Sequence, residues 1–291
     1  MPKRQEVAQT RQVKNKGGSG GLFFWCGRRT GTRSGKLAAM KPTAILSAIA
    51  EEQRGLLALL QRPQKTRHAG RDFWQGELHG QPVVLALSKI GKVAAATTAT
   101  ALIERFAVGR VVFTGVAGGL GEGVQVGDVV VATDFLQHDL DVSPLFPPYE
   151  VPFYGKARFD GDTALTALLY TAACAALAPV DADRSAQRFP QARVHRGLLA
   201  SGDRFVSGSA ESQALQAVLA GAGHAVLAVE MEGAAVAQVC LDYGVPFAAM
   251  RTISDRADDS AHVDFPRFVD EVASHYAQVI VERFLLSLSI T

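Results

Sequence analysis

Residues 225–243 have the sequence AVLAVEMEGAAVAQVCLDY, an apolar run that ends in two acidic residues before a segment of helical period. A short apolar run of this kind is typical of a buried strand. Glu230 and Glu232 stand where the predicted strand ends, and a second apolar run, residues 246–253, ends in the same way at Ser254 and Asp255. An unpaired charge beside a core is costly, so we expect these carboxylates to be paired, hydrogen-bonded or bound to a ligand.

The same alternation of short apolar runs and longer helical segments extends along the chain from residue 43. It is typical of a sheet covered by helices on both faces. We therefore predict one α/β domain over residues 40–291, with three layers (α/β/α) and a central twisted sheet. The predicted strands are 44–49, 83–88, 110–114, 128–134, 197–200, 225–229 and 246–253, and the predicted helices are 92–106, 162–178, 210–220, 233–243 and 265–286.

Residues 1–39 differ from the rest in charge. They hold nine of the 30 Lys and Arg residues but only one of the 28 acids, which leaves 21 basic and 27 acidic residues in 40–291. The pI of about 8.5 therefore comes from this basic leader and does not indicate nucleic-acid binding. We predict that the leader is disordered. We consider three interpretations of the leader: Met40 is the natural start of the protein, the leader is an organelle transit peptide, or it is a solvated tail.

The three cysteines, Cys26, Cys174 and Cys240, are odd in number and lack metal-ligand spacing. Cys174 and Cys240 fall in apolar helical patterns, so we expect both to be buried free thiols. No apolar segment has the length of a membrane span. We expect a cytoplasmic protein with no metal and no membrane partner.

Several predicted strands end in residues that can bind or act on a ligand. In open α/β sheets, ligands bind outside the carboxyl ends of the strands. Besides the two acidic pairs, the residues at these ends are Glu51 and Glu52, residues 115–119 (GVAGG) and residues 202–206 (GDRFV). We therefore expect one site at this edge of the sheet.

Glu230 and Glu232 are two residues apart and would point to the same face if the backbone stays extended. Their carboxylates would then suit the adjacent 2′ and 3′ hydroxyls of a ribose. The alternative is a pair of acids at the N-terminus of the following helix, where the helix dipole favours them.

Asp255 is a candidate general acid if burial favours its protonated form, and Glu52 is a candidate for acting on a water molecule. The alternatives are ordinary ones. Asp255 would cap a turn or pair with Arg251 or Arg256, and Glu51 or Arg54 would cap the helix that follows the first strand.

Residues 115–119 lack both common phosphate-binding motifs. A P-loop needs Lys and a hydroxyl residue after its last glycine, but Leu120-Gly121-Glu122 follows. We expect these glycines to let the backbone approach a neutral sugar or base. Phe205 offers a flat apolar surface for a heterocycle, with Val206 beside it, although a single Phe is more often part of a core.

Taken together, these segments resemble the nucleoside phosphorylase/hydrolase superfamily, and most closely the 5′-methylthioadenosine/S-adenosylhomocysteine nucleosidases. The resemblance extends from about Met40 to Leu286 and implies a central mixed sheet. It rests on residues 47–52 (SAIAEE), 90–93 (IGKV), 114–119 (TGVAGG), 201–205 (SGDRF), 229–232 (VEME) and 253–255 (ISD).

The resemblance implies a role for each candidate residue. Asp255 would protonate N7 of adenine, and Glu52 would orient and deprotonate the attacking water. Glu232 would bind the ribose hydroxyls, with Glu230 beside it, and Met231 would pack against the sugar. Phe205 and Val206 would hold the adenine, and Ser254 would position Asp255. Two positions depart from the family pattern, namely Val116, where Ser or Thr is frequent, and Arg204, where a small residue is common.

Water rather than phosphate is the expected nucleophile. A phosphorylase must bind a dianion with Arg or Lys, and related phosphorylases carry arginines where this chain has Glu51-Glu52 and Phe113. We expect no cation beside the acids. The alternatives are a futalosine or AMP nucleosidase, a purine nucleoside phosphorylase, and a non-catalytic nucleoside-binding protein. Residues 138–154 resemble the loop that reaches a partner's site in the family dimer, which implies a homodimer. We expect no cofactor and no nucleic-acid partner.

Overall fold

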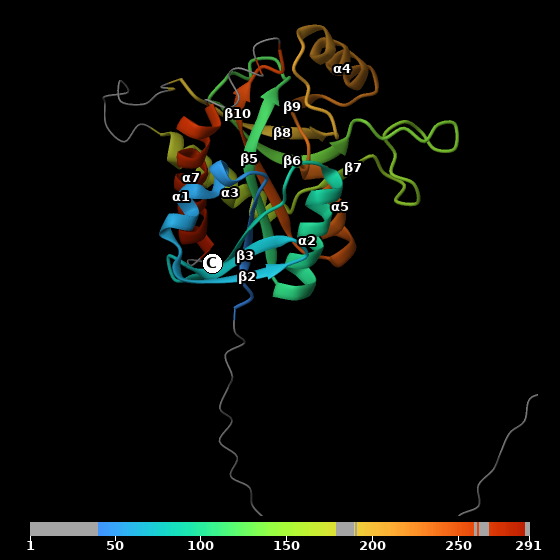
Figure 1. Cartoon of the computed structure of the whole chain (residues 1–291). Helices are drawn as coiled ribbons and strands as arrows, with labels where there is room; N and C mark the ends of the chain where they lie inside the picture. Colours follow the sequence, from blue (N-terminus) through green and yellow to red (C-terminus); the bar gives the residue numbers. More distant parts are fainter. Residues whose placement is uncertain (1–39, 179–188, 190, 259–260, 262–267, 289–291) are drawn as a thin grey trace, which may run out of the picture. The chain divides into compact units, whose positions relative to one another are not determined.

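A mixed sheet of ten strands lies at the centre of the computed structural model (Figure 1). The structure describes residues 40–178, 189, 191–258, 261 and 268–288. The strand order is β10-β6-β8-β9-β5-β1-β4-β3-β2, with β7 paired to β6. The strands are β1 Thr43–Ser47, β2 Gln61–His68, β3 Arg71–Leu78, β4 Gln81–Leu87, β5 Arg110–Gly119, β6 Val129–Gln137, β7 Arg158–Asp160, β8 Val194–Ser201, β9 Val226–Glu230 and β10 Phe247–Asp255. The interpretations of residues 1–39 lie outside the described residues.

Part of the sheet closes on itself, because β10 pairs with β5 as well as with β6. β5 runs parallel to β1 and β10, whereas β9 is antiparallel to β5 and meets it only through Gly118 and Gly119. The carboxyl ends of β5 and β9 therefore cross each other. Gly118 and Gly119 of β5 are thus paired with Val229 and Ala228, next to Glu230 at the end of β9.

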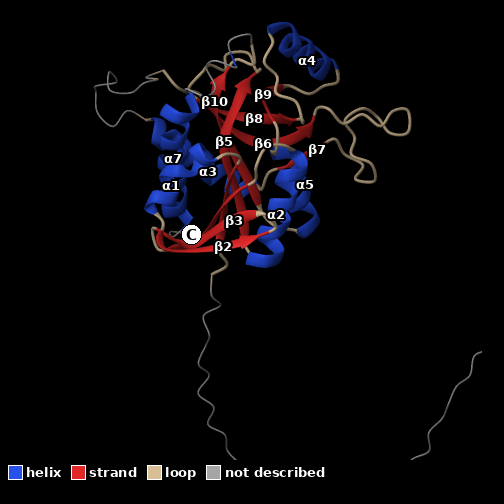
Figure 2. Ribbon diagram, viewed as in Figure 1, coloured by secondary structure: helices blue, strands red, loops and turns tan. Residues whose placement is uncertain are grey.

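Helices cover both faces of the sheet, as Figure 2 shows. α1 Ala50–Leu59, α3 Thr163–Leu177 and α7 Ser274–Leu288 pack together on one face, and α2 Lys92–Phe106 and α5 Gly233–Tyr243 on the other. α4 Ser209–Gly221 lies near β9 and buries only Leu219 among its side chains. The predicted three-layer α/β/α fold is confirmed.

The core consists of two main apolar layers, one on each side of the sheet. Leu46, Phe113 and Val236 belong to the layer under α2 and α5, and Ile45 and Ile280 to the layer under α1, α3 and α7. Alternate residues of β1 thus enter opposite layers, which explains why the strand is buried along its whole length. None of the helices in the described ranges is long and apolar enough to cross a membrane.

Local sequence signals account for the helix ends. The side chain of Asp162 accepts a hydrogen bond of 2.8 Å from the N–H of Leu165 and so caps α3. α5 ends at Gly244, whose φ of 62° places it in the left-handed region that glycine adopts without strain. The predictions for α2 and α5 agree with the structure at both ends.

Several sequence-based predictions were wrong. The strands β2, β3 and β7 were not among the predicted elements, and α1 was anticipated only as a helix after the first strand, without bounds. β2 is exposed and polar and gives no apolar alternation. Residues 115–119 belong to β5 and are not a loop. Cys240 is a buried free thiol as expected, but Cys174 is exposed. The predicted helix 265–286 corresponds to a π-helix, η2 Val269–Ala273, followed by α7, while residues 265–267 lie outside the described part.

Candidate active site

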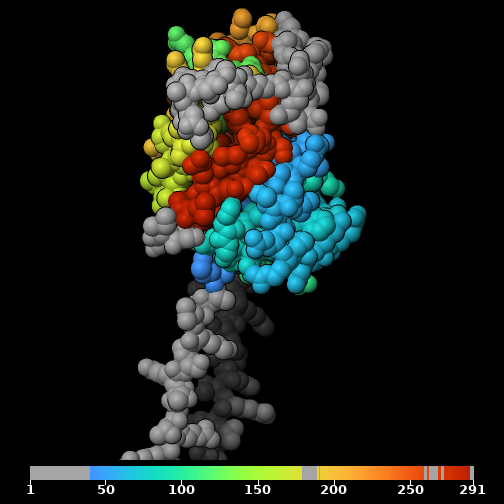
Figure 3. Space-filling model, turned by 90° about the vertical axis from the view of Figure 1, so that its left-hand side faces the viewer, coloured from blue at the N-terminus to red at the C-terminus, as the bar shows by residue number. Residues whose placement is uncertain are grey.

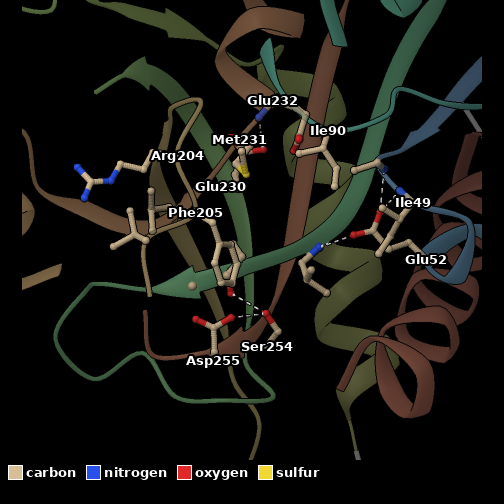
Figure 4. Close-up of a pocket in the computed structure, with 16 residues that line it drawn as sticks. Ile49, Glu52, Ile90, Arg204, Phe205, Glu230, Met231, Glu232, Ser254 and Asp255 are labelled. Atoms are coloured by element: carbon tan, nitrogen blue, oxygen red, sulfur yellow. Dashed lines mark hydrogen bonds between the residues drawn. The ribbon is translucent and has the colours of Figure 1, made fainter. Parts of the chain in front are cut away.

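A cavity of about 430 Å³ opens where residues at or after the carboxyl ends of β1, β5, β8, β9 and β10 come together. We call it the acidic cavity, because Glu52, Glu230, Glu232 and Asp255 line it (Figure 4). Every residue predicted for catalysis or substrate binding lies on its wall, namely Glu52, Val116, Phe205, Val206, Glu230, Met231, Glu232, Ser254 and Asp255. The predicted convergence of strand ends on one site is therefore observed.

Glu52 is buried in the first turn of α1 and faces the acidic cavity. Its Oε2 accepts hydrogen bonds from the N–H groups of Ala48 (2.8 Å) and Ile49 (3.1 Å), and Oε1 accepts one from Val116 (3.2 Å). Burial raises the pKa of Glu52, and the charge of Arg251 together with the three N–H donors offsets part of this rise. A fixed carboxylate with a raised pKa is suited to accept a proton from water.

Asp255 is buried at the end of β10. Its Oδ2 accepts a hydrogen bond of 2.8 Å from the Ser254 hydroxyl, and its Oδ1 accepts one of 2.8 Å from the N–H of Ala257. The pairing of β10 with β5 shifts register between Ile253 and Asp255, a bulge that re-aims the side chains at the strand end. Ser254 is therefore in direct contact with the carboxylate that the resemblance implied it would position.

Two glycines of β5 leave room for these carboxylates. A Cβ atom on Gly115 would lie 2.9 Å from Oε1 of Glu52, and one on Gly118 would lie 3.0 Å from Oδ1 of Asp255 and 2.9 Å from Cβ of Ala257. The prediction that the glycines let backbone approach a ligand therefore needs correction. At these two positions they accommodate the acidic side chains of the site itself.

Glu230 forms a buried ion pair with Arg251, in which Nη2 of Arg251 lies 2.6 Å from Oε2 of Glu230. Glu230 also accepts hydrogen bonds from the Ser201 hydroxyl and from the N–H of Gly233 (2.9 Å), at the start of α5. Its carboxylate is occupied by the protein, which differs from the predicted ligand contact and agrees with the alternative of an acid at a helix N-terminus.

The expectation that no cation accompanies the acids was wrong, because Arg251 is buried beside them. Nη1 of Arg251 donates to the carbonyl oxygens of Met250 (3.0 Å) and Phe113 (3.4 Å), and its guanidinium lies 4.1 Å from the centre of the Phe113 ring. An ionisable residue inside the predicted apolar strand 246–253 was the signal available in the sequence. Arg251 had been considered only as a partner of Asp255.

Glu232 takes a different direction from Glu230, because β9 ends at Glu230 and the backbone at residue 232 has φ −139° and ψ −37°. The two acids were expected to share one face only if the strand continued through residue 232, and this condition is not met. Oε1 of Glu232 accepts a hydrogen bond of 2.8 Å from the N–H of Gly91, just before α2. Burial, and next the charge of Glu230, raise the pKa of Glu232 to about 8, against the lowering effects of Gly91 and Arg251.

Phe205 follows β8 and is 43% exposed, so it is not a core residue. Figure 4 shows its ring on the side of the cavity that holds Ser254 and Asp255. Arg204 lines the cavity too, but its Nε lies 2.8 Å from Oε1 of Glu211. Val206 is buried.

A network of polar contacts fixes the segment that carries Phe205, and sequence reasoning missed it. Oδ1 of Asp203 accepts a hydrogen bond of 2.8 Å from the N–H of Lys92, and the N–H of Asp203 donates to Asp139 (2.9 Å). The ammonium of Lys92 lies 2.6 Å from Asp139. The start of α2 is therefore tied both to this segment and to Glu232.

Within the described residues, no group of three His, Cys, Asp or Glu side chains is placed to hold a metal ion. The acidic cavity does bring together carboxylates, a hydroxyl and backbone groups.

Comparison with known proteins agrees with this fold. Residues 42–286 match the model of the phosphorylase superfamily. A 5′-methylthioadenosine/S-adenosylhomocysteine nucleosidase of Bacillus thuringiensis is 37% identical over 240 residues, which cover 82% of this chain and 96% of the relative.

Solved structures give the same result. The nucleosidase of this name from Neisseria meningitidis, in complex with methylthio-immucillin-A, has a TM-score of 0.75 and 35% identity and covers 85% of this chain and 100% of its own. Futalosine hydrolase of Helicobacter pylori has a TM-score of 0.73 and 31% identity and covers 85% of this chain and 98% of its own. The chain belongs to the phosphorylase superfamily and, within it, to the family of 5′-methylthioadenosine/S-adenosylhomocysteine nucleosidases.

Proposed function

We propose that the protein hydrolyses the N-glycosidic bond of 5′-methylthioadenosine and S-adenosylhomocysteine, releasing adenine and the thioribose product. The observation that carries the proposal is the placement of Glu52, Glu232 and Asp255 around one cavity, with Phe205 beside Asp255. Relatives of this name that are over 30% identical support the choice of substrates.

In this proposal Asp255 donates a proton to N7 of adenine while Phe205 and Val206 hold the ring. The proton makes adenine a better leaving group as the ribose approaches an oxocarbenium ion. Ser254 keeps the carboxyl group of Asp255 in place through its 2.8 Å hydrogen bond. This acid and base division parallels that of O-glycosidases, although the leaving atom here is nitrogen.

On the opposite side of the glycosidic bond, Glu52 would take a proton from the attacking water. Glu232 would bind the ribose hydroxyls, with Met231 against the sugar. Burial raises the pKa of Glu232 to about 8, which favours the protonated carboxyl group before substrate binds. Binding to two hydroxyl donors would favour the ionised form.

The cations near the acidic cavity support water as the nucleophile. Arg204 is the only Lys or Arg among the described residues that line the cavity, and it pairs with Glu211. Arg251 is paired with Glu230 and packed on Phe113. Each of these two cations is thus paired with a glutamate, which favours an uncharged nucleophile over a phosphate dianion.

We also propose a homodimer in which residues 138–154 of one copy cover the 5′ end of the substrate in the other. Leu145 and Phe153 of this loop are 79% and 94% exposed, and Ile90 on the cavity wall is 59% exposed. Exposed apolar side chains of this size favour contact with a second copy. The free thiols of Cys174 and Cys240 suit a cytoplasmic enzyme, with methionine salvage as its pathway.

Base release from a panel of nucleosides tests the proposal. The purified protein is incubated with methylthioadenosine, S-adenosylhomocysteine, futalosine and inosine, each with and without phosphate. We expect adenine from the first two without phosphate, and Asp255→Asn should abolish it. Turnover of futalosine alone would favour a futalosine hydrolase. Phosphate-dependent turnover would favour a phosphorylase, and no turnover of any nucleoside would favour a nucleoside-binding protein.

A further inference from the structure

A second cavity, of about 270 Å³, lies between α1 and the β2–β3 hairpin. We call it the basic cavity, because Arg54, Arg67, Arg71 and Lys89 line it and Asp72 is the only acid among the described residues on its wall. Figure 3 shows α1 in blue and the hairpin in cyan side by side on this part of the surface. Trp74 supplies an aromatic wall.

Two of these cations have no carboxylate partner among the described residues. Arg71 donates to the carbonyl oxygens of Ala69 (2.9 Å) and Ala94 (3.1 Å), which fix its guanidinium but do not neutralise its charge. Nε of Arg71 is buried and has no hydrogen-bond acceptor within the described ranges. Lys89 is exposed at the cavity and forms no ion pair there.

Asp72 does not neutralise the charges of Arg71 and Lys89. Asp72 already lies 2.8 Å from the ammonium of Lys65 and 3.5 Å from the guanidinium of Arg67. Arg71 and Lys89 therefore present two positive charges to the cavity, and Arg71 adds an unused N–H donor. An oxyanion supplies the charge and the acceptor atoms that this arrangement lacks.

The basic cavity shares a wall with the acidic cavity. Ala48 lines both, and consecutive residues of one segment face them in turn, since Lys89 lines the basic cavity and Ile90 the acidic one. The next residue, Gly91, donates its N–H to Glu232. A group bound by Lys89 would therefore lie one residue away from the wall of the proposed ribose site.

We propose that the basic cavity is a binding site for a carboxylate or phosphate group, held by Arg71 and Lys89. Two sources of such a group fit its position. One is the amino-acid carboxylate of S-adenosylhomocysteine bound in the acidic cavity, a group that methylthioadenosine lacks, and this source rests on the proposed function. The other is a free anion such as inorganic phosphate, which does not.

The sequence offers a direct reporter for anion binding. The chain has two tryptophans, Trp25 in the leader and Trp74 in the basic cavity, so a Trp25→Phe background leaves Trp74 as the single tryptophan. In this background, Trp74 emission is followed while inorganic phosphate is added at constant ionic strength, with chloride as the blank. Arg71→Gln and Lys89→Gln are compared with Arg62→Gln.

Arg62→Gln is the matched control. Arg62 stands on the same hairpin and pairs with Glu77 outside the basic cavity, and its loss changes the net charge by the same amount. The thermal unfolding midpoint shows whether each variant folds. If Arg71→Gln does not fold, the test is decided by Lys89→Gln, because the Lys89 side chain is exposed. The kcat/KM values for S-adenosylhomocysteine and methylthioadenosine are measured on the same proteins.

A saturable response to phosphate that weakens about tenfold in Arg71→Gln and Lys89→Gln, but not in Arg62→Gln, would support a free anion as the source. A fall of about tenfold in kcat/KM for S-adenosylhomocysteine alone would support the substrate carboxylate. The proposal is overturned if phosphate gives no saturable response and the ratio of the two kcat/KM values equals that of the control. If neither nucleoside is turned over by the unmodified protein, the proposed function fails, while the phosphate titration still decides this proposal.

Discussion

Arg251 and Glu230 form a buried ion pair, with 2.6 Å between Nη2 and Oε2, and the charge of Arg251 lowers the pKa of both Glu52 and Glu232. Glu230 in turn raises the pKa of Glu232. The pair therefore links the residues proposed to bind ribose and to activate water. It also joins β10 to the end of β9.

Breaking this pair should destabilise the fold strongly. Arg251→Met leaves Glu230 buried without its partner, and we expect a loss of about 3–5 kcal/mol in the free energy of unfolding, measured by urea denaturation. Arg204→Met removes an exposed arginine that pairs with Glu211, and should cost about 1 kcal/mol or less. Similar losses in the two variants would show that burial of the Arg251–Glu230 pair has no energetic consequence.

Glu52→Gln should lower kcat by about 10²–10⁴-fold with little change in KM, because an amide cannot take a proton from water. Glu51→Gln is the control, since Glu51 stands in the same turn of α1 but does not line the acidic cavity. Adenine release is the measurement. Retention of activity in Glu52→Gln, or an equal loss in Glu51→Gln, would remove Glu52 from the role of base.

Gly118→Ala should lower kcat by about 10²-fold, because the added Cβ would meet Oδ1 of Asp255 at 3.0 Å and displace the proposed acid. Gly221→Ala is a matched glycine substitution with open space around the added atom. Steady-state kinetics and thermal unfolding are measured on both variants. If Gly118→Ala keeps full activity while folded, close placement of Asp255 against β5 is not required.

The raised pKa of Glu232 predicts how stability depends on pH. Burial raises its folded-state pKa from the ordinary value of 4.5 to about 8, so its contribution to the free energy of unfolding is fully present below about pH 4.5 and is lost as the pH rises through 8. Glu232→Gln cannot ionise. Its free energy of unfolding relative to the unmodified protein should therefore increase between pH 5 and pH 9, by an amount of the order of a few kcal/mol.

Urea denaturation at several pH values measures this difference. The exposed Glu122 provides the control, and Glu122→Gln should show no such trend over the same range. A difference between Glu232→Gln and the unmodified protein that stays constant with pH would contradict the raised pKa.

Apolar strands and amphipathic helices were predictable because burial imposes a period on the sequence. The ends of α2 and α5 agree with prediction for this reason, and the cavity residues were found because polar groups interrupt apolar runs at strand ends. The exposed strand β2 carries no such period, so the hairpin and the basic cavity beside it were missed.

Pairwise contacts between distant segments were not predictable from one sequence. The partner of Arg251 lies 21 residues away, on another strand, and the turn of the backbone after Glu230 separates the directions of Glu230 and Glu232. Likewise, the sequence does not show whether Gly115 and Gly118 leave room for a ligand or for a side chain. The short distances from an added Cβ atom to Glu52 and Asp255 show that these side chains fill the space.

The most direct test of the central claim is the source of the oxygen in the sugar product. Methylthioadenosine is turned over in water enriched in oxygen-18, with inorganic phosphate of natural isotopic composition present, and the sugar is analysed by mass spectrometry before its C1 hydroxyl exchanges. Hydrolysis predicts adenine and 5-methylthioribose that carries one oxygen-18 atom. A sugar 1-phosphate without oxygen-18 would contradict it.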